Sequence, residues 1–277
     1  MIARTAGPQQ LRTPEADLEY LILGSGEPVT VFAHGLAGTM DELRGMAGGV
    51  QGTRVLFNFR GHGGSTCRPE AVNGYAGLAD DLRAMAAHTG ARRILGLSMG
   101  ASAAVRVLGQ QPNRFERAVL LRPTTLDTPL DTVARREARA VTEAAERGDL
   151  SALQHFVTQR IPGTHRRQNS ALDLIAARVD VLTSPGGRAT LAAMVTDTPR
   201  TPPARLREVG TATLVVGVLG DALHPESTAQ RIAAAVPGSE LHICRTPGAA
   251  WTRRAHICEL AVSFLNEPTA PGLAPAA

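Results

Sequence analysis

Gly96-Leu97-Ser98-Met99-Gly100 is the stretch that decides the fold, because it places a serine between two glycines where an apolar run meets a helical pattern. The apolar run covers residues 93–97, and the helical pattern of small residues covers 99–110. A sharp turn from a strand into a helix exposes a serine hydroxyl only if the flanking residues are this small. The pattern predicts that Ser98 lies at the tip of such a turn as a candidate nucleophile. The alternative is a glycine-flanked serine in an ordinary strand-to-helix connection.

Short apolar runs alternate with helical patterns on both sides of this turn. Such alternation is typical of β-α-β units and predicts an α/β protein with a mostly parallel sheet. The predicted strands are residues 18–23, 29–33, 55–59, 93–97, 118–121, 213–219 and 240–244. The predicted helices around them are residues 41–47, 75–89, 99–110 and, after the last strand, 253–265.

The alternation stops in the middle of the chain, where only helical patterns occur. These patterns cover residues 130–147, 150–159, 170–182 and 187–196. Because the strand pattern resumes at residue 213, we interpret residues 124–207 as a helical lid inserted into one core domain, which consists of residues 1–123 and 208–266. The Pro/Ala/Gly-rich residues 267–277 are predicted to be a disordered tail.

The composition favours a soluble protein that does not bind nucleic acid. The 277-residue chain has a formal net charge of +4, and its 29 basic residues, all arginine, are scattered among 25 acidic ones, so nucleic-acid binding is not indicated. Three cysteines without a metal-ligand spacing favour neither a disulfide framework nor a zinc site. The N-terminal residues lack the apolar run of a signal peptide, and no stretch of 18 apolar residues follows, which predicts a cytoplasmic protein that does not enter a membrane.

A second motif, His34-Gly35-Leu36-Ala37-Gly38, follows the predicted strand at 29–33. A developing oxyanion needs two backbone N–H donors, one from the residue after the nucleophile and one from the loop after a neighbouring strand. Met99 and Leu36 are the predicted donors, with His34 and Gly35 beside the substrate pocket. His34 is interpreted as bracing the loop by hydrogen bonding. His62, in the glycine-rich turn Arg60-Gly61-His62-Gly63, is likewise interpreted as stabilising its turn.

The order of these motifs resembles that of the α/β-hydrolase superfamily, in its branch of small lidded esterases, lactonases and C–C bond hydrolases. The likeness covers about residues 19–265 and includes Asp81 and the segment Pro112-Asn113-Arg114-Phe115. The resemblance implies a mostly parallel, eight-stranded sheet flanked by helices, with an inserted lid. It also implies that the catalytic acid follows the seventh strand. Gly220-Asp221-Ala222-Leu223-His224-Pro225 matches that pattern, so Asp221 is the expected acid, and a surface or turn-capping aspartate is the alternative.

The histidine of that family is expected after the eighth strand, where this chain has Pro247-Gly248-Ala249-Ala250-Trp251. Trp251 then occupies the position of the base, and its indole has no basic nitrogen. His256, five residues later, is the histidine that we expect to replace it. The alternative is that His256 packs or faces solvent on the last helix. His224, beside the acid turn, and His242, within a strand, are weaker candidates.

Two functions remain open at this point. One is a serine hydrolase that acts on a small ester, thioester or lactone carbonyl through Ser98, Asp221 and His256. The other, which rests on Trp251, is a triad-deficient member of the fold that binds a small ligand or catalyses an isomerisation, epimerisation or cyclisation in a biosynthetic pathway. A structural or interaction module is the weakest hypothesis. No cofactor or metal is expected, since the chain has no Rossmann glycine triplet and hydrolases of this fold normally need neither. The oligomeric state is not readable from the sequence.

Overall fold

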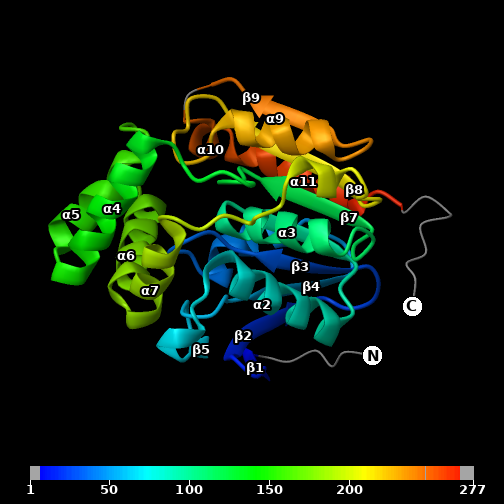
Figure 1. The fold of residues 1–277 in the computed structure, drawn as a ribbon, viewed down its shortest axis with the longest axis horizontal. Coiled ribbons are helices and arrows are strands. Elements are labelled where there is room, and N and C mark those ends of the chain that lie inside the picture. Colours follow the sequence, from blue (N-terminus) through cyan, green and yellow to red (C-terminus); the bar gives the residue numbers. More distant parts are fainter. Residues whose placement is uncertain (1–6, 247, 269–277) are drawn as a thin grey trace.

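A mostly parallel sheet runs through the middle of the molecule (Figure 1). The computed structural model describes residues 7–246 and 248–268, and in it nine strands follow the order β1-β2-β4-β3-β6-β7-β8-β9, with β5 beside β2. The pairs that include β2 are antiparallel, and all other pairs are parallel. The strands are β1 (Gln9–Arg12), β2 (Ala16–Leu23), β3 (Val29–Ala33), β4 (Thr53–Phe57), β5 (Thr66–Cys67), β6 (Arg93–Leu97), β7 (Arg117–Leu121), β8 (Ala212–Val218) and β9 (Glu240–Cys244).

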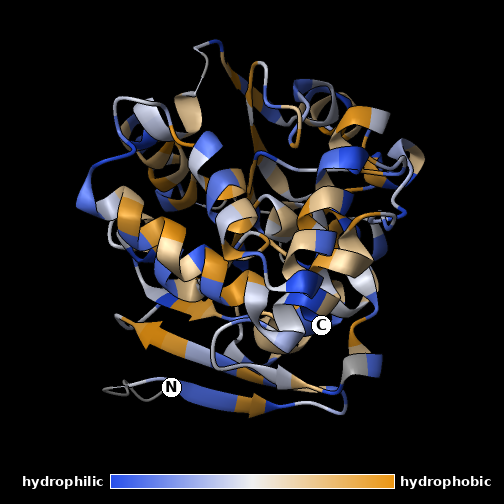
Figure 2. Cartoon of the chain, turned by 90° about the vertical axis from the view of Figure 1, so that its left-hand side faces the viewer, coloured by the Kyte–Doolittle hydropathy of each residue, from blue (hydrophilic) through white to orange (hydrophobic). Residues whose placement is uncertain are grey.

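Helices cover both faces of the sheet, and each face has its own hydrophobic core. On one face pack α2 (Gly74–Thr89), α3 (Met99–Gln110) and α9 (Glu226–Ala235). The other face is covered by the short helices η1 (Met40–Leu43) and α1 (Arg44–Ala47) and by α11 (Arg254–Asn266). In Figure 2 the helical ribbons that face the viewer carry both hydrophobic and hydrophilic residues. Because β3 and β7 are buried on both faces, their sequences are apolar except for Thr30 and Arg117.

The prediction of a mostly parallel sheet flanked by helices is confirmed, but the sheet has nine strands where eight were expected. Two of the strands that the sequence patterns do not predict lie at the antiparallel end, where burial is partial. In β1 exposed residues alternate with half-buried ones, and β5 is only two residues long. Neither strand has the apolar run on which the prediction relied. Helix α9 was also missed, although its buried residues Thr228, Ala229, Ile232 and Ala235 recur at helical spacing.

Between β7 and β8 the chain leaves the sheet and forms four helices at one end of the molecule (Figure 1). These inserted helices are α4 (Thr132–Arg147), α5 (Leu150–Gln159), α6 (Asn169–Thr183) and α7 (Pro185–Met194). Asp131 and Asp149 cap α4 and α5 by accepting hydrogen bonds from backbone N–H groups of the first turn. The inserted helices share a small hydrophobic core of their own, and the helix α8 (Pro203–Leu206) leads back to the sheet. Of the predicted disordered tail, residues 269–277 lie outside the described residues.

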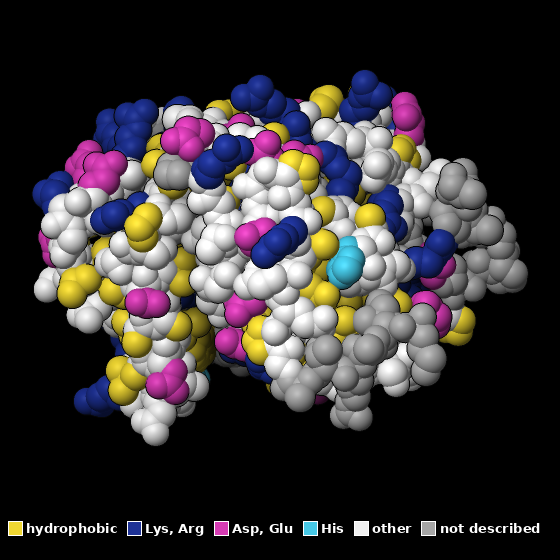
Figure 3. Space-filling view, turned by 90° about the horizontal axis from the view of Figure 1, so that it is seen from below, with side chains coloured by type: hydrophobic (Ala, Val, Ile, Leu, Met, Phe, Trp, Pro, Cys, Tyr) yellow, Lys and Arg dark blue, Asp and Glu magenta, His cyan; other side chains and the backbone are white. Residues whose placement is uncertain are grey.

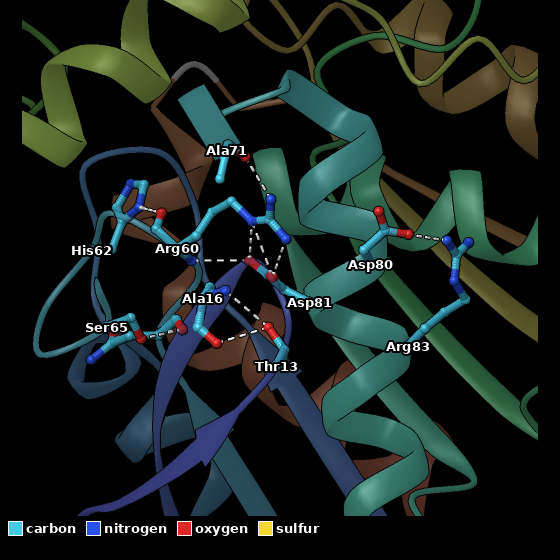
Figure 4. A network of polar contacts seen from close by, with 10 residues as sticks. Thr13, Ala16, Arg60, His62, Ser65, Ala71, Asp80, Asp81 and Arg83 are labelled. Carbon is cyan, nitrogen blue, oxygen red and sulfur yellow. Dashed lines mark hydrogen bonds and ion pairs between the residues drawn. The ribbon is translucent and has the colours of Figure 1, made fainter. Parts of the chain in front are cut away.

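A buried ion pair fixes the turn after β4. The Arg60 guanidinium donates to both carboxylate oxygens of Asp81 on α2, at 2.7 to 3.1 Å, and to the carbonyl oxygen of Ala71 at 2.6 Å. Ala71 ends the short helix η2 (Pro69–Ala71), and Figure 4 shows the Arg60 and Asp81 side chains pointing toward each other from separate elements. The Arg60 N–H also donates to Asp81. A buried ion pair stabilises a fold when its polar atoms are satisfied in this way. The pair therefore orders the glycine-rich turn that holds His62.

The surface mixes charges of both signs with uncharged residues. On the face in Figure 3, arginine and acidic side chains are interspersed with hydrophobic atoms. Within the ranges 7–246 and 248–268, no helix combines the length and the apolar character needed to cross a bilayer.

Candidate active site

Ser98 lies in the turn between β6 and α3, where the sequence predicts it. Its backbone has φ 55° and ψ −113°, a conformation that residues other than glycine rarely adopt. A Cβ atom on Gly96 would lie 2.6 Å from the Gly100 carbonyl oxygen, and a Cβ atom on Gly100 would lie 2.3 Å from the Ala33 carbonyl oxygen. Since these contacts are with backbone, neither glycine can be replaced without moving β3, β6 or α3. The two glycines are therefore a steric requirement of this turn.

The loop after β3 passes directly beside Ser98. A Cβ atom on Gly35 would lie only 3.3 Å from the Cβ atom of Ser98. Neither the Leu36 N–H nor the Met99 N–H, which begins α3, donates to another group within the described part of the chain. Both residues line the cavity described below. The structure thus brings the two predicted oxyanion donors to the surroundings of Ser98.

His34 lies underneath this loop, outside the cavity that it was expected to line. Its side chain is completely buried, and its Nδ1 is 2.7 Å from the Gly35 carbonyl oxygen. Its Nε2 accepts a hydrogen bond of 3.1 Å from the Phe59 N–H. Burial lowers the pKa of His34 to about 4, so near pH 7 the ring is neutral and Nδ1 carries the proton donated to Gly35. His34 therefore links the loop to the end of β4.

The side chain that contacts Ser98 is His224. Its Nε2 is 2.7 Å from the Ser98 Oγ, and its Nδ1 is 2.9 Å from the Oδ2 of Asp221. Asp221 and His224 belong to one turn after β8, which the His224 N–H closes by donating to the Asp221 carbonyl oxygen at 3.1 Å. The Leu223 N–H donates to the carboxylate of Asp221 at 3.2 Å. A serine, an imidazole and a carboxylate thus form one hydrogen-bonded chain.

His256 does not take part in this chain, contrary to the expectation from the sequence. It lies on the exposed side of α11, and its ring contacts that of His242, with centroids 5.4 Å apart. Trp251 belongs to the short helix α10 (Ala249–Thr252) and lines the cavity with Gly35, as predicted for the pocket. His224 was ranked too low because family order places the histidine after β9. The available signal was its spacing of three residues from Asp221 within one turn.

Arg122 is the charged group closest to the Asp221–His224 pair. Arg122 directly follows β7, as Ser98 directly follows β6. The two strands end side by side, because Leu97 and Leu121 are paired in the sheet. Its Nη2 is 3.4 Å from the Nδ1 of His224, and its Nε is 3.7 Å from the Oδ2 of Asp221. Burial, and after it the charge of Arg122, lowers the pKa of His224. Although burial raises the pKa of Asp221, the hydrogen bond and charge of His224 and the charge of Arg122 lower it to about 2. At pH 7 the carboxylate is therefore ionised and the imidazole is neutral.

A cavity of about 270 Å³ lies between the end of the sheet and the inserted helices. Its floor contains Ser98, Met99, Leu36 and His224, and its opposite wall comes from all four inserted helices. The lining is mostly apolar, with four arginines, Arg122, Arg160, Arg178 and Arg254, and one carboxylate, Glu42. Arg160 is paired with Glu137, and Arg178 is paired with Glu42. The cavity can therefore enclose a small apolar molecule against the Ser98 hydroxyl.

Comparisons with known proteins agree with this architecture. Residues 28–243 match the family model described as "alpha/beta hydrolase fold". A hydrolase from Pseudomonas aeruginosa PA01 superposes with a TM-score of 0.80 at 22% identity, covering 95% of this chain and 99% of that chain. An esterase from Exiguobacterium antarcticum gives a TM-score of 0.78 at 18% identity over 91% of this chain and 96% of the other. The enol-lactonase from Burkholderia xenovorans LB400 gives a TM-score of 0.76 at 19% identity, covering 94% of this chain and 100% of that chain.

At these identities the solved structures show the fold alone, and no curated protein sequence matches the chain. The family model, in contrast, spans most of the chain, from the start of β3 almost to the end of β9. The chain therefore belongs to the α/β-hydrolase fold family.

Proposed function

We propose that this protein is a serine hydrolase that cleaves small carboxylic esters or lactones, with Ser98, His224 and Asp221 as its catalytic triad. The observation that carries the proposal is the 2.7 Å contact between the Ser98 Oγ and the Nε2 of His224. A serine hydroxyl is a weak nucleophile unless a neighbouring base takes its proton. The sequence left that base in question, and His224 supplies an imidazole at hydrogen-bonding distance.

The protonation states follow from the contacts. An ionised carboxylate can only accept hydrogen bonds, so the Nδ1 of His224 carries the proton that faces Asp221. The Nε2 lone pair then faces Ser98 and accepts the hydrogen bond from its hydroxyl. This is the tautomer that a general base requires. Asp221 holds the ring in that tautomer and favours the imidazolium that forms when the proton is taken.

The reaction then proceeds in two halves. The Ser98 Oγ attacks the carbonyl carbon while its proton moves to the Nε2 of His224, and the new oxyanion accepts hydrogen bonds from the N–H groups of Leu36 and Met99. His224 returns the proton to the alkoxide leaving group, which leaves an acyl-enzyme on Ser98. A water molecule, deprotonated by His224, attacks this acyl group, and the carboxylic acid is released as Ser98 regains its proton.

The cavity supports a substrate of modest size. Apolar side chains from α5, α6 and α7, such as Phe156, Leu182 and Leu191, form most of the wall opposite Ser98. Two arginines of the lining already have a carboxylate partner. We therefore expect an ester or lactone with a small apolar acyl or alcohol group, and a lid role for the inserted helices that cover it.

The alternative of a fold member without an acyl-enzyme rested on the tryptophan in the expected histidine position. Trp251 lines the cavity, but it is not the group beside the Ser98 hydroxyl. Since the imidazole of His224 occupies that place, no observation favours a non-hydrolytic reaction over ester cleavage.

Hydrolysis of short p-nitrophenyl esters by three single variants tests the proposal. We expect Ser98→Ala and His224→Ala each to lower kcat/KM by at least about 10³-fold, because each removes part of the proton-transfer chain. His256→Ala is the matched control, an imidazole lost from the exposed side of α11, and should hydrolyse at the wild-type rate. A fluorophosphonate probe should label the wild type at Ser98 and leave Ser98→Ala unlabelled. Equal activity of wild type and His224→Ala, or loss of activity in His256→Ala alone, would contradict the assignment of the base.

A further inference from the structure

The loop that carries Leu36 contains a tight four-residue turn, residues 35–38. The Gly38 N–H donates to the Gly35 carbonyl oxygen at 3.0 Å, which closes the turn. Its third residue, Ala37, has φ 57°, as in turns of type II, where this position is usually a glycine. Such a turn differs from the commoner type I by a flip of its central peptide, here the bond between Leu36 and Ala37. With an alanine at that position, the turn itself does not favour the observed orientation.

Arg178 of the inserted helix α6 contacts this central peptide. Its Nη1 donates to the Leu36 carbonyl oxygen at 3.1 Å, across 142 positions of sequence. Its Nη2 donates to the Oε1 of Glu42, on η1, which immediately follows the loop. The arginine therefore holds the carbonyl of Leu36, the residue whose N–H, in the preceding peptide, is the candidate oxyanion donor.

Glu42 supports the same arrangement from the other side. Its second oxygen, Oε2, is buried without a hydrogen-bond partner in the described residues, and a Cβ atom on Gly38 would lie 2.3 Å from it. The carboxylate is thus packed against the end of the turn. A buried carboxylate oxygen without a donor is unfavourable unless a nearby cation compensates it, and Arg178 is that cation.

Apolar packing joins the turn to the same inserted helices. Ala37 belongs to the hydrophobic core formed by α4 to α7, and Leu36 packs against that core. The turn therefore packs against the insertion through both residues, while Leu36 also contacts the core of the sheet. Displacing α6 would remove both the guanidinium and the apolar surface that hold it.

We propose that Arg178 is a positioning residue: by holding the Leu36 carbonyl, the inserted helices fix the backbone of Leu36, and so keep the N–H of Leu36, which lies in the preceding peptide, aligned with the oxyanion. The oxyanion site is then complete only when α6 is seated on the loop. This inference rests on the proposed function, because it assigns a role within the same hydrolysis. It differs from substrate binding, since Arg178 acts through the backbone of Leu36.

The test compares Arg178→Gln and Arg178→Lys with Arg166→Gln. Arg166 is the matched control: it is a half-buried arginine of the insertion that donates to a backbone carbonyl, that of Ile161, away from the turn. We expect Arg178→Gln to lower kcat about 10- to 100-fold with KM nearly unchanged, somewhat less than the loss of an oxyanion donor itself. Its Ki for a trifluoromethyl ketone, which forms a tetrahedral adduct, should rise in parallel. Arg178→Lys, which keeps the charge, should recover part of kcat, and Arg166→Gln should match the wild type.

Amide hydrogen exchange gives a second readout that does not depend on turnover. Peptides covering residues 35–40 should exchange faster in Arg178→Gln than in the wild type and in Arg166→Gln. If the wild type proves inactive, the proposed function fails, while the exchange still decides whether Arg178 holds the turn. A rise in KM at constant kcat would show that Arg178 binds substrate instead, and unchanged kcat and exchange would show that it does neither. Either result overturns the inference.

Discussion

Two charges of opposite sign act on one imidazole in this site. Asp221 faces the Nδ1 of His224 and stabilises the imidazolium, while Arg122 lies 3.4 Å from the same nitrogen and destabilises it. Because Nδ1 already carries a proton toward Asp221, the guanidinium cannot donate to it, and the contact is electrostatically repulsive. Arg122 also has a positive φ of 50°, an uncommon conformation for a side chain of this size. The site therefore keeps His224 neutral down to a lower pH than Asp221 alone would allow.

The pH dependence of the Arg122→Gln variant follows from this arrangement. After burial, the charge of Arg122 is the largest influence that lowers the pKa of His224, so removing it raises that pKa. Since the reaction needs the neutral imidazole, the acidic limb of the kcat/KM profile should move to higher pH, by roughly half a unit to one unit. The profile is measured on a short p-nitrophenyl ester between pH 4 and 8.

Arg231→Gln provides the control, because it removes the same charge from an exposed pair with Asp127. The acidic limb of the kcat/KM profile of Arg231→Gln should coincide with that of the wild type. A shift of the Arg122→Gln limb toward lower pH would show that the guanidinium does not destabilise the imidazolium.

For single residues, the sequence predicted where each residue lies in the fold better than which side chains contact each other. The turn around Ser98 could be recognised because its two glycines flank the serine at fixed positions between a strand pattern and a helix pattern. Asp221 could be placed because residues 220–225 resemble the pattern in which the α/β-hydrolase family carries its acid after the seventh strand. The choice among His224, His242 and His256 depended on which ring reaches Ser98 across 126 or more positions of sequence, and periodicity carries no information on that contact. Trp251, in the position where the family has its histidine, correctly indicated that the histidine lies elsewhere. It did not indicate that His224 takes that place.

Among the elements, the connection from β6 to α3 is the most constrained, because α3 begins against the end of β3. The substitution Gly100→Ala puts a methyl group at 2.3 Å from the Ala33 carbonyl oxygen, so α3 must move away from β3. We expect a loss of about 1–3 kcal/mol in the free energy of unfolding, the range found for overpacking a tight site. Hydrolysis should fall as well, since Ser98 precedes the displaced helix by a single residue. Urea unfolding monitored by circular dichroism measures the first effect.

Gly45→Ala is the comparison for this variant. Gly45 lies in α1, a Cβ atom there would meet nothing within 4 Å, and alanine favours a helix more than glycine does. Its stability should equal or exceed that of the wild type. If Gly100→Ala unfolds at the same urea concentration as Gly45→Ala, the elbow is not under the steric constraint described here.

Strands were easier to predict from the sequence when they are buried on both faces than when they lie at the edge of the sheet. Parallel strands such as β3 and β7 are covered on both faces, so their sequences are mostly apolar. Helix α3 begins and ends at the residues that its small-residue pattern predicts. The edge strands β1 and β5 are formed by pairing with β2, a contact that their own residues do not encode. The contact between α6 and the Leu36 loop could not be predicted for the same reason, because neither segment has a sequence feature that indicates the other.

For the whole molecule, the site lies where the sheet domain meets the inserted helices. The sheet supplies Ser98 from the end of β6 and Asp221 and His224 from the turn after β8. The insertion supplies much of the cavity wall and contacts the oxyanion loop. Two completely buried imidazoles, His34 and His62, lie side by side beneath this loop, with ring centroids 4.9 Å apart. Their location makes the folding of the entire molecule, and not only catalysis, dependent on pH.

Both rings must stay neutral in the folded chain. Burial lowers the pKa of His34 from 6.5 to about 4 and that of His62 from 6.5 to about 3, and the Nε2 of His62 is buried without a partner in the described residues. Below pH 6.5 the unfolded chain therefore takes up protons that the folded chain does not bind, and the folded state loses stability as the pH falls toward 4. Each histidine contributes at most about 1.4 kcal/mol per pH unit to that loss. We expect the free energy of unfolding, measured with urea between pH 7 and 4.5, to fall steeply over this window.

The variant His62→Gln tests the assignment, because glutamine does not titrate. Whatever its stability at pH 7, its free energy of unfolding should fall less steeply with acidification than that of the wild type, by up to about 1.4 kcal/mol per pH unit. His155→Gln, which removes an exposed histidine of α5, should keep the wild-type slope. Slopes that are equal in His62→Gln and in the wild type would mean that this buried ring is not a source of the acid sensitivity.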